Sequence, residues 1–326
     1  MDKIFLSDKD NFNFSEMNAY DKQLYLSTLK NYLIEYRDSL GINPNNTFGI
    51  EVEYEGVSHE KLIEPITYYT GWNSIIEKGF EVGGEVVSPV LIDNPMNWKD
   101  IKDILNIIKN TEGTYATSDA GAHVHVGAHL LKEYNNLINF LLLYTVYEGV
   151  LYRFGYMDRL NPRKTIISCA SPISIELAND LETIMGKKTV RGINTRYERF
   201  FGVNFRNLSS LKNRKGKNTI EFRFGNGTFD PVLWQNYINT CIKLLEASKK
   251  DLDIDRLLYL VYRIKENRIN NAGIDKLNID QAMEFCDIIF DSALDKTNFM
   301  RQYIKDGEET VDSSNQMYSR RFTRGA

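Results

Sequence analysis

Thr47-Phe-Gly-Ile-Glu-Val-Glu-Tyr-Glu55 alternates apolar and acidic side chains, which is the pattern of a β-strand with one buried face and one polar face. Three later stretches show the same alternation: Gly83-Gly-Glu-Val-Val-Ser-Pro89, Gly121-Ala-His-Val-His-Val-Gly127 and Thr219-Ile-Glu-Phe-Arg-Phe224. Four strands of this kind predict one sheet with an apolar back and a polar front. The front would carry carboxylates, two histidines and one arginine.

The polar face predicted in this way is crowded with potential metal ligands. Strand by strand it presents Glu51, Glu53 and Glu55, then Glu85, then His123 and His125, and last Glu221 and Arg223. Carboxylates at such spacing cannot all ionise unless cations compensate them. Magnesium takes oxygen ligands and leaves positions for water and phosphate, and paired cations neutralise a phosphoryl group during transfer. The motifs therefore predict a divalent-metal site, with Arg223 as a fixed charge for the transition state.

The number of histidines excludes other metal-binding folds, and missing motifs exclude the common hydrolase and nucleotide-binding folds. Amidohydrolase barrels and cupins need further histidine ligands after a His-x-His motif. This chain has four histidines, and only His129 follows the motif, so it lacks those ligands. A Gly-x-Ser-x-Gly elbow, a P-loop and a dinucleotide fingerprint are all missing from the sequence. A nucleotide would have to bind through another architecture.

Composition narrows the class further. The 326 residues are 42% hydrophobic and 12% aromatic, enough for a substantial core, and the net charge of −4 argues against a dedicated nucleic-acid binder. Three scattered cysteines do not form a disulfide framework. The first fourteen residues are polar, and the apolar run 137–154 is interrupted by charges, so it predicts a buried helix. We expect a cytoplasmic protein that binds neither nucleic acid nor membrane.

The segments between the strands favour helices, which makes the expected fold α+β. Apolar residues at helical spacing predict helices over 15–39 and from Asn94-Pro95 onward. Further elements are expected as a helix over 171–185, a strand over 200–205 and helices from 234 to about 304. Half-polar strands separated by helices indicate a largely antiparallel sheet.

The order of the motifs resembles a known family. Five motifs carry the resemblance, in this order: Phe48-Gly-Ile-Glu-Val-Glu53, Gly84-Glu-Val-Val-Ser-Pro89, Ala122-His-Val-His-Val-Gly127, Val203-Asn204 and Thr219-Ile-Glu-Phe-Arg223. The resemblance is to the amidoligases. These enzymes belong to the glutamine synthetase and glutamate–cysteine ligase superfamily. The resemblance covers residues 47–230 and implies a curved, largely antiparallel sheet with helices packed on its back, followed by C-terminal helices.

The resemblance also implies an activity, namely ATP-dependent joining of a carboxylate to an amine through an acyl phosphate. ATP and magnesium or manganese ions would be the cofactors. The implied metal ligands are Glu51, Glu53, Glu85, His123 and Glu221. Arg223 would act in catalysis together with Glu53, and His125 and Asn204 would contact the nucleotide.

Two parts of the family pattern are not matched residue by residue in this sequence. The segment Gly71-Trp-Asn-Ser-Ile-Ile-Glu77 replaces the usual Asp-Gly-Ser stretch, so Glu77 or Glu81 could add a ligand. The basic segment, residues 157–199, should supply arginines for the ATP phosphates. The candidates nearest to the Asn204 strand are Arg191, Arg196 and Arg199.

These expectations divide the chain into an N-terminal helical segment (1–46), a glutamine synthetase-like catalytic domain (47–305) and a flexible tail (306–326). The partners would be small-molecule or peptide acids and amines, and the sequence leaves the substrates and oligomeric state open. A kinase-type phosphotransferase on the same sheet and a non-catalytic nucleotide- or metal-binding module are the alternatives.

Overall fold

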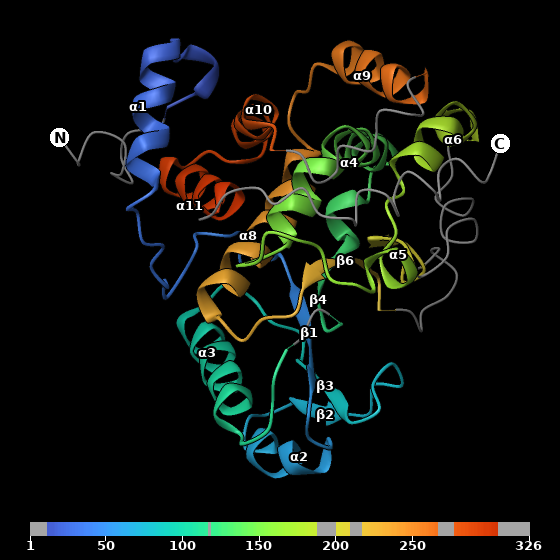
Figure 1. The fold of residues 1–326 in the computed structure, drawn as a ribbon. Coiled ribbons are helices and arrows are strands. Elements are labelled where there is room, and N and C mark those ends of the chain that lie inside the picture. Colours follow the sequence, from blue (N-terminus) through green and yellow to red (C-terminus); the bar gives the residue numbers. More distant parts are fainter. Residues whose placement is uncertain (1–11, 117–118, 188–199, 209–216, 267–276, 306–326) are drawn as a thin grey trace.

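A six-stranded sheet forms the centre of the protein, shown as a computed structural model in Figure 1. The structure describes residues 12–116, 119–187, 200–208, 217–266 and 277–305. The strand order is β2-β3-β1-β4-β6-β5, and every neighbouring pair is antiparallel. The strands are β1 (Phe48–Glu55), β2 (Asn73–Ile75), β3 (Gly83–Val87), β4 (Gly121–Gly127), β5 (Val203–Asn204) and β6 (Thr219–Asn226). The α+β class and the antiparallel sheet are thus as the sequence predicted.

Three helices cover the apolar back of the sheet: α3 (Pro95–Asn110), α4 (Tyr134–Gly155) and α8 (Pro231–Ala247). Phe48 of β1 stacks on Trp98 of α3, with ring centroids 5.3 Å apart. Phe222 and Phe224 of β6 meet aromatic rings of α4 and α8 in edge-on contacts. Alternate residues of the strands therefore enter one aromatic core, which leaves the opposite face to the polar side chains.

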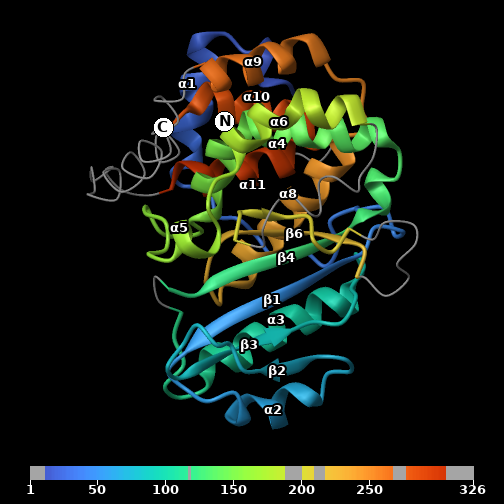
Figure 2. The same cartoon turned by 90° about the vertical axis from the view of Figure 1, so that its right-hand side faces the viewer.

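The remaining helices lie mainly beyond the β6 side of the sheet. They are η1 (Phe14–Glu16), α1 (Ala19–Leu29), α2 (Glu60–Thr67), η2 (Ala128–Leu131), α5 (Ile166–Cys169), α6 (Ser174–Lys187), α9 (Ile254–Glu266), α10 (Ile279–Ile289) and α11 (Ala293–Ile304). Figure 2 shows α6, α9 and α10 gathered on that side, whereas α2 lies at the opposite end beside β2. Among the described residues, no helix is long and apolar enough to cross a membrane.

The N-terminal segment differs from the helix expected over 15–39. Helix α1 ends at Leu29, and the chain then runs on without helical structure, held by contacts to distant elements. Tyr36 donates to the backbone carbonyl of Trp98 at 2.5 Å, and Arg37 forms an ion pair with Asp295 at 2.6 Å. These tertiary contacts outweigh the helical periodicity of the sequence, which is a weak local preference.

Helix α6 begins at Ser174, later than the sequence predicted, and a buried carboxylate explains the position of its first residue. Glu148 of α4 is buried and accepts hydrogen bonds from the backbone N–H groups of Ile173 (2.7 Å) and Ser174 (2.9 Å). These are among the first N–H groups of a helix, which have no partner within it. Helix α6 therefore begins at Ser174, after Pro172, and not at residue 171. The strand expected over 200–205 is reduced to β5.

Candidate functional site

The register of the sheet places the predicted polar residues on one face. Glu51 lies opposite His123, and Glu53 lies opposite Glu85. His125 lies opposite Glu221 across the next pair of strands. Because directly opposed residues of an antiparallel pair point to the same side, these groups share the front of the sheet.

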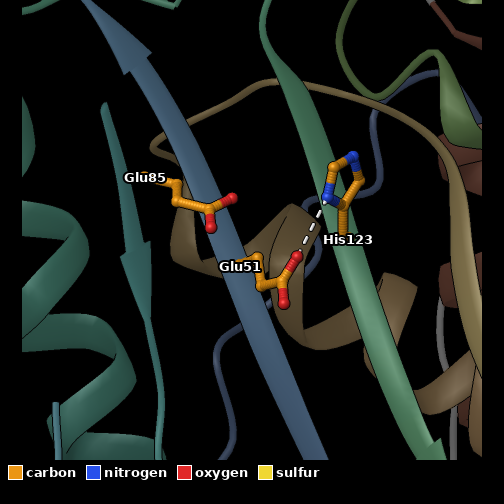
Figure 3. Close-up of side chains that lie close together, drawn as sticks. All are labelled: Glu51, Glu85 and His123. Carbon is orange, nitrogen blue, oxygen red and sulfur yellow. Dashed lines mark hydrogen bonds and ion pairs between the residues drawn. The ribbon is translucent and has the colours of Figure 1, made fainter. Parts of the chain in front are cut away.

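Glu51 is at the centre of this group. Its Oε2 lies 3.3 Å from Nδ1 of His123, and its Oε1 lies 3.0 Å from Nε2 of His125. Burial alone would raise the pKa of Glu51, but the hydrogen bonds and charges of the two imidazoles outweigh it and hold that pKa well below its ordinary value. Figure 3 shows Glu51 between Glu85 on one side and His123 on the other. Glu51 is therefore an ionised carboxylate with one oxygen directed at each histidine.

Two groups of ligand atoms share Glu51. The first comprises Glu51, Glu85 and His123, and the second comprises Glu51, His125 and Glu221. Within each group the candidate ligand atoms all lie within 4.8 Å of one another. We refer to these five residues as the carboxylate–imidazole cluster. Its oxygen and imidazole nitrogen donors suit a divalent cation.

Glu85 shows why a cation would fit. Burial, followed by the charges of Glu51, Glu77 and Glu53, raises the pKa of Glu85 to about 8. Burial and the neighbouring negative charges both disfavour the ionised form of this carboxyl. A divalent cation between Glu51 and Glu85 would compensate these charges. The residues present therefore fit a metal ion.

Glu221 is already engaged by two donors. Arg223 donates from Nη1 to Glu221 Oε1, and Asn204 donates from Nδ2 to Oε2 at 2.7 Å. Although burial opposes its ionisation, the nearby charges, led by Arg223, keep the pKa of Glu221 below its ordinary value. Arg223 also donates from Nε to the carbonyl of Cys169 in α5, at 3.4 Å. Asn204 and Arg223 thus orient Glu221, and Arg223 lies beside the cluster.

A pocket of about 470 Å³ opens beside Glu51 and His125. Gly49 lies opposite His125 in the register, so the front of β1 carries no side chain at that point. Pro89 and Val90 form an apolar part of the wall, and Nζ of Lys217 lies 3.6 Å from Oε1 of Glu51. The pocket combines an apolar surface with the positively charged side chain of Lys217 next to the cluster.

Glu53 has partners different from those of the other acids. Its Oε2 accepts a hydrogen bond from the backbone N–H of Gly121 at 2.5 Å and lies 3.8 Å from Nη1 of Arg163. Its Oε1 lies 3.3 Å from Nε2 of His123. Glu53 belongs to neither group of candidate ligands. Sequence reasoning did not single out Arg163, because nothing in the pattern Asn-Pro-Arg-Lys distinguishes it from the other basic residues of its segment.

The remaining candidates are not among the ligands of the cluster or lie outside the described residues. Arg191, Arg196 and Arg199 lie outside the described ranges, so their contacts with phosphate remain a prediction. Glu77 accepts from the backbone N–H of Gly79, Glu81 is exposed, and neither belongs to the ligand groups.

A fully antiparallel sheet with a partly buried carboxylate–imidazole cluster on its front defines an α+β protein with a candidate divalent-metal centre. Its family is established by the sequence. The family model described as "Putative amidoligase enzyme" matches residues 70–245, more than half of the chain, and the protein belongs to this amidoligase family. The resemblance seen in the strand motifs is confirmed.

Other comparisons add little. The curated proteins include no match to this sequence. Among solved structures, the protein is similar to a bifunctional glutathione synthetase from Pasteurella multocida, with a TM-score of 0.38 and 10% sequence identity. The match covers 94% of this chain and 49% of that one, so the chain spans about half the length of the synthetase. A likeness at this level carries no argument about fold or function.

Proposed function

We propose that the protein is an ATP-dependent carboxylate–amine ligase with a glutamine synthetase-like catalytic sheet. One observation carries the proposal: Glu51 is shared by two groups of buried or half-buried ligand residues on the polar face of the sheet. Membership of the amidoligase family supports the reaction class. Magnesium or manganese would be held by Glu51, Glu85, His123 and Glu221, with His125 on the side of the pocket.

The reaction has two steps. An oxygen of the acid substrate attacks the γ-phosphorus of ATP, ADP leaves, and an acyl phosphate forms. The amine then attacks the acyl carbon, inorganic phosphate leaves, and the amine loses a proton to give the amide. The bound cations would supply compensation for the phosphate charge.

The protein's own side chains would orient the reactants. Arg223 lies next to Glu221 at the cluster, where its planar guanidinium can stabilise the charge that develops on the transferred phosphoryl group. His125 and Lys217 line the pocket, where they would contact the ATP phosphates. The apolar wall of the pocket, including Pro89 and Val90, would pack against the nucleoside.

Calorimetry with ATP tests the proposal without knowledge of the substrates. We expect ATP to bind in the presence of Mg²⁺, and to lose most of its affinity when a chelator is added or when Glu51 is changed to Gln. The variant Glu55→Gln removes a charge from the same strand outside the cluster and serves as the control. Equal ATP affinity with and without chelator, or no binding in either case, contradicts the proposal.

A second assay separates the ligase from a kinase on the same sheet. With an acid labelled by ¹⁸O in its carboxylate, a ligase transfers one labelled oxygen to inorganic phosphate when the amide forms. A phosphotransferase would instead leave a stable phosphorylated product and release no labelled phosphate. Screening acid and amine pairs for ADP release identifies the acid to label.

A further inference from the structure

Two glycines shape the pocket beside Glu51. Gly49 of β1 and Gly127 of β4 both line it, and both have the strand parity of the residues on the polar face, so the front of the sheet lacks a side chain at each position. At Gly49 the floor is backbone alone, on which a planar ring can lie. At Gly127 neighbours take the space: a Cβ there would lie 2.6 Å from Oγ1 of Thr47 and 2.8 Å from Nδ1 of His129. Two polar side-chain atoms therefore converge at this end of the pocket.

A chain of hydrogen bonds fixes the ring of His129. Glu246 forms an ion pair with Lys243 at 2.8 Å and accepts a hydrogen bond from Nδ2 of Asn46 at 2.5 Å. Because a carboxylate only accepts, the amide nitrogen of Asn46 faces Glu246 and its oxygen Oδ1 faces Nε2 of His129, at 3.3 Å. An amide oxygen also only accepts, so Nε2 carries the proton of the neutral imidazole.

The other ring nitrogen of His129, Nδ1, is left as an acceptor. Partial burial, followed by the positive charge of Lys249, lowers the pKa of His129 below its ordinary value, so the ring is neutral at pH 7.5 and Nδ1 keeps its lone pair. Among the residues that the structure describes, nothing donates a hydrogen bond to Nδ1 or to the hydroxyl of Thr47. His129 is exposed and lines the pocket, so a bound molecule can reach it.

An acceptor beside a hydroxyl matches one edge of adenine. The 6-amino group of adenine is a donor, and the neighbouring ring nitrogen N1 is an acceptor. The amino group can donate to Nδ1 of His129 while N1 accepts from the hydroxyl of Thr47. A 6-oxo purine presents the reverse order, so in the same position its oxygen faces the lone pair of Nδ1. The two atoms therefore discriminate between amino and oxo bases.

The base and the phosphates would occupy different ends of the pocket. Gly127 lies two residues beyond His125 along β4, which is about 7 Å in a strand. Lys217 and His125 lie on the side of Glu51, whereas Thr47 and His129 converge at Gly127. A nucleotide whose phosphates face Glu51 thus directs its base toward His129.

We propose that His129 selects the base of the nucleotide by accepting a hydrogen bond from an exocyclic amino group, with Thr47 bonded to the neighbouring ring nitrogen. Asn46 is a positioning residue, because it holds the proton of His129 on Nε2 and keeps Nδ1 toward the pocket. The inference rests on the proposed function, since it requires a nucleotide in this pocket.

Calorimetry with ATP and with inosine triphosphate, both in Mg²⁺, tests the selection, because the two bases differ only in the 6-amino or 6-oxo group and the proton on N1. We expect the wild type to bind ATP at least about tenfold more tightly, since the oxo base loses a hydrogen bond and leaves Nδ1 unpaired. His129→Ala should bring the ratio of the two affinities close to one. His59→Ala removes a histidine outside the pocket, beside Glu60, and should keep the ratio of the wild type.

Nitrogen-15 NMR of the nucleotide-free protein tests the positioning role of Asn46 separately. The His129 signals are assigned by their loss in His129→Ala, and we expect a ring protonated on Nε2. Asn46→Leu should shift the proton toward a mixture of both nitrogens and lower the ratio of ATP to inosine triphosphate affinity. A wild-type ring protonated on Nδ1 overturns the inference.

The binding results distinguish this inference from the proposed function. If the wild type binds both nucleotides equally well, or if His129→Ala keeps the full ratio, base selection by His129 is wrong and the proposed function stands. If the wild type binds neither nucleotide in Mg²⁺, the proposed function fails and base selection fails with it.

Discussion

Glu85 gives the candidate metal centre a pH dependence whose size can be worked out in advance. Burial and the neighbouring carboxylates raise the pKa of Glu85 to about 8, so the group is mostly protonated at pH 6.5. The proton must leave before the carboxylate can bind a cation, so affinity rises with pH. A pKa of about 8 reduces the affinity about 30-fold at pH 6.5 but only slightly at pH 8.5. We therefore expect Mg²⁺ affinity to rise about 25-fold between these values, or about 1.9 kcal/mol.

Calorimetric titration with Mg²⁺ at pH 6.5, 7.5 and 8.5 measures this rise, and Glu85→Gln is the matched variant. The variant should bind Mg²⁺ more weakly at pH 8.5 and should lose most of the pH dependence; any slope that remains belongs to the other ligands. An identical slope in wild type and Glu85→Gln would refute the assignment of the raised pKa to a cation ligand.

The same raised pKa has a consequence for stability without metal. A carboxyl whose pKa is higher in the folded state than in the unfolded state contributes stability below its unfolded pKa, and that contribution is lost as the pH rises through about 8. Glu51 has the opposite sign, because its pKa is lowered and its contribution is lost as the pH falls. With chelator present, Glu85→Gln should therefore raise the melting temperature relative to wild type at pH 8 more than at pH 5.

Three further predictions concern the nucleotide and the transfer step. Arg223→Ala should lower single-turnover rates by about 10²–10³ with ATP affinity nearly intact, and Arg223→Lys should rescue poorly because a point charge lacks the planar fork; unchanged chemistry with a lower melting temperature would make Arg223 structural. Changing any of the three arginines 191, 196 and 199 to Ala should weaken Mg²⁺-dependent ATP binding, and unaltered calorimetric affinity in all three would contradict this. Gly49→Val should place a side chain in the pocket beside His125 and weaken ATP binding at least about tenfold, with Mg²⁺ affinity measured alone as the control.

The polar face was predictable from the sequence because the side chains of a strand alternate with a period of two. That period alone assigns Glu51, Glu85, His123, His125 and Glu221 to faces, and the apolar residues between them decide which face is buried. Once each strand has its apolar back against the helices, the polar residues have only one side to occupy. The sheet and the convergence of these residues therefore followed from local pattern.

Arg163 was not predictable in this way. It lies in an irregular connection, where side-chain direction has no period, and its guanidinium lies 3.8 Å from Glu53 in the space that Gly121 leaves without a side chain. In the sequence, only Gly121 marks the space that Arg163 fills. This glycine is also the first residue of the His-x-His strand, so nothing about it indicates a neighbouring arginine. The end of α1 was missed for a similar reason, since distant partners such as Asp295 and the carbonyl of Trp98 hold the chain after Leu29.

The cluster draws its side chains from strands that lie far apart along the chain, from Glu51 in β1 to Glu221 in β6. No short piece of the polypeptide contains both, so a cation that needs both binds the folded chain and hardly binds the unfolded one. Such a cation acts as a folding ligand, and at a free concentration of about 100 times its dissociation constant it adds about 2.7 kcal/mol to the stability of the fold. The ionic composition of the surroundings would then control how much of the protein is folded, in addition to any part it takes in the reaction.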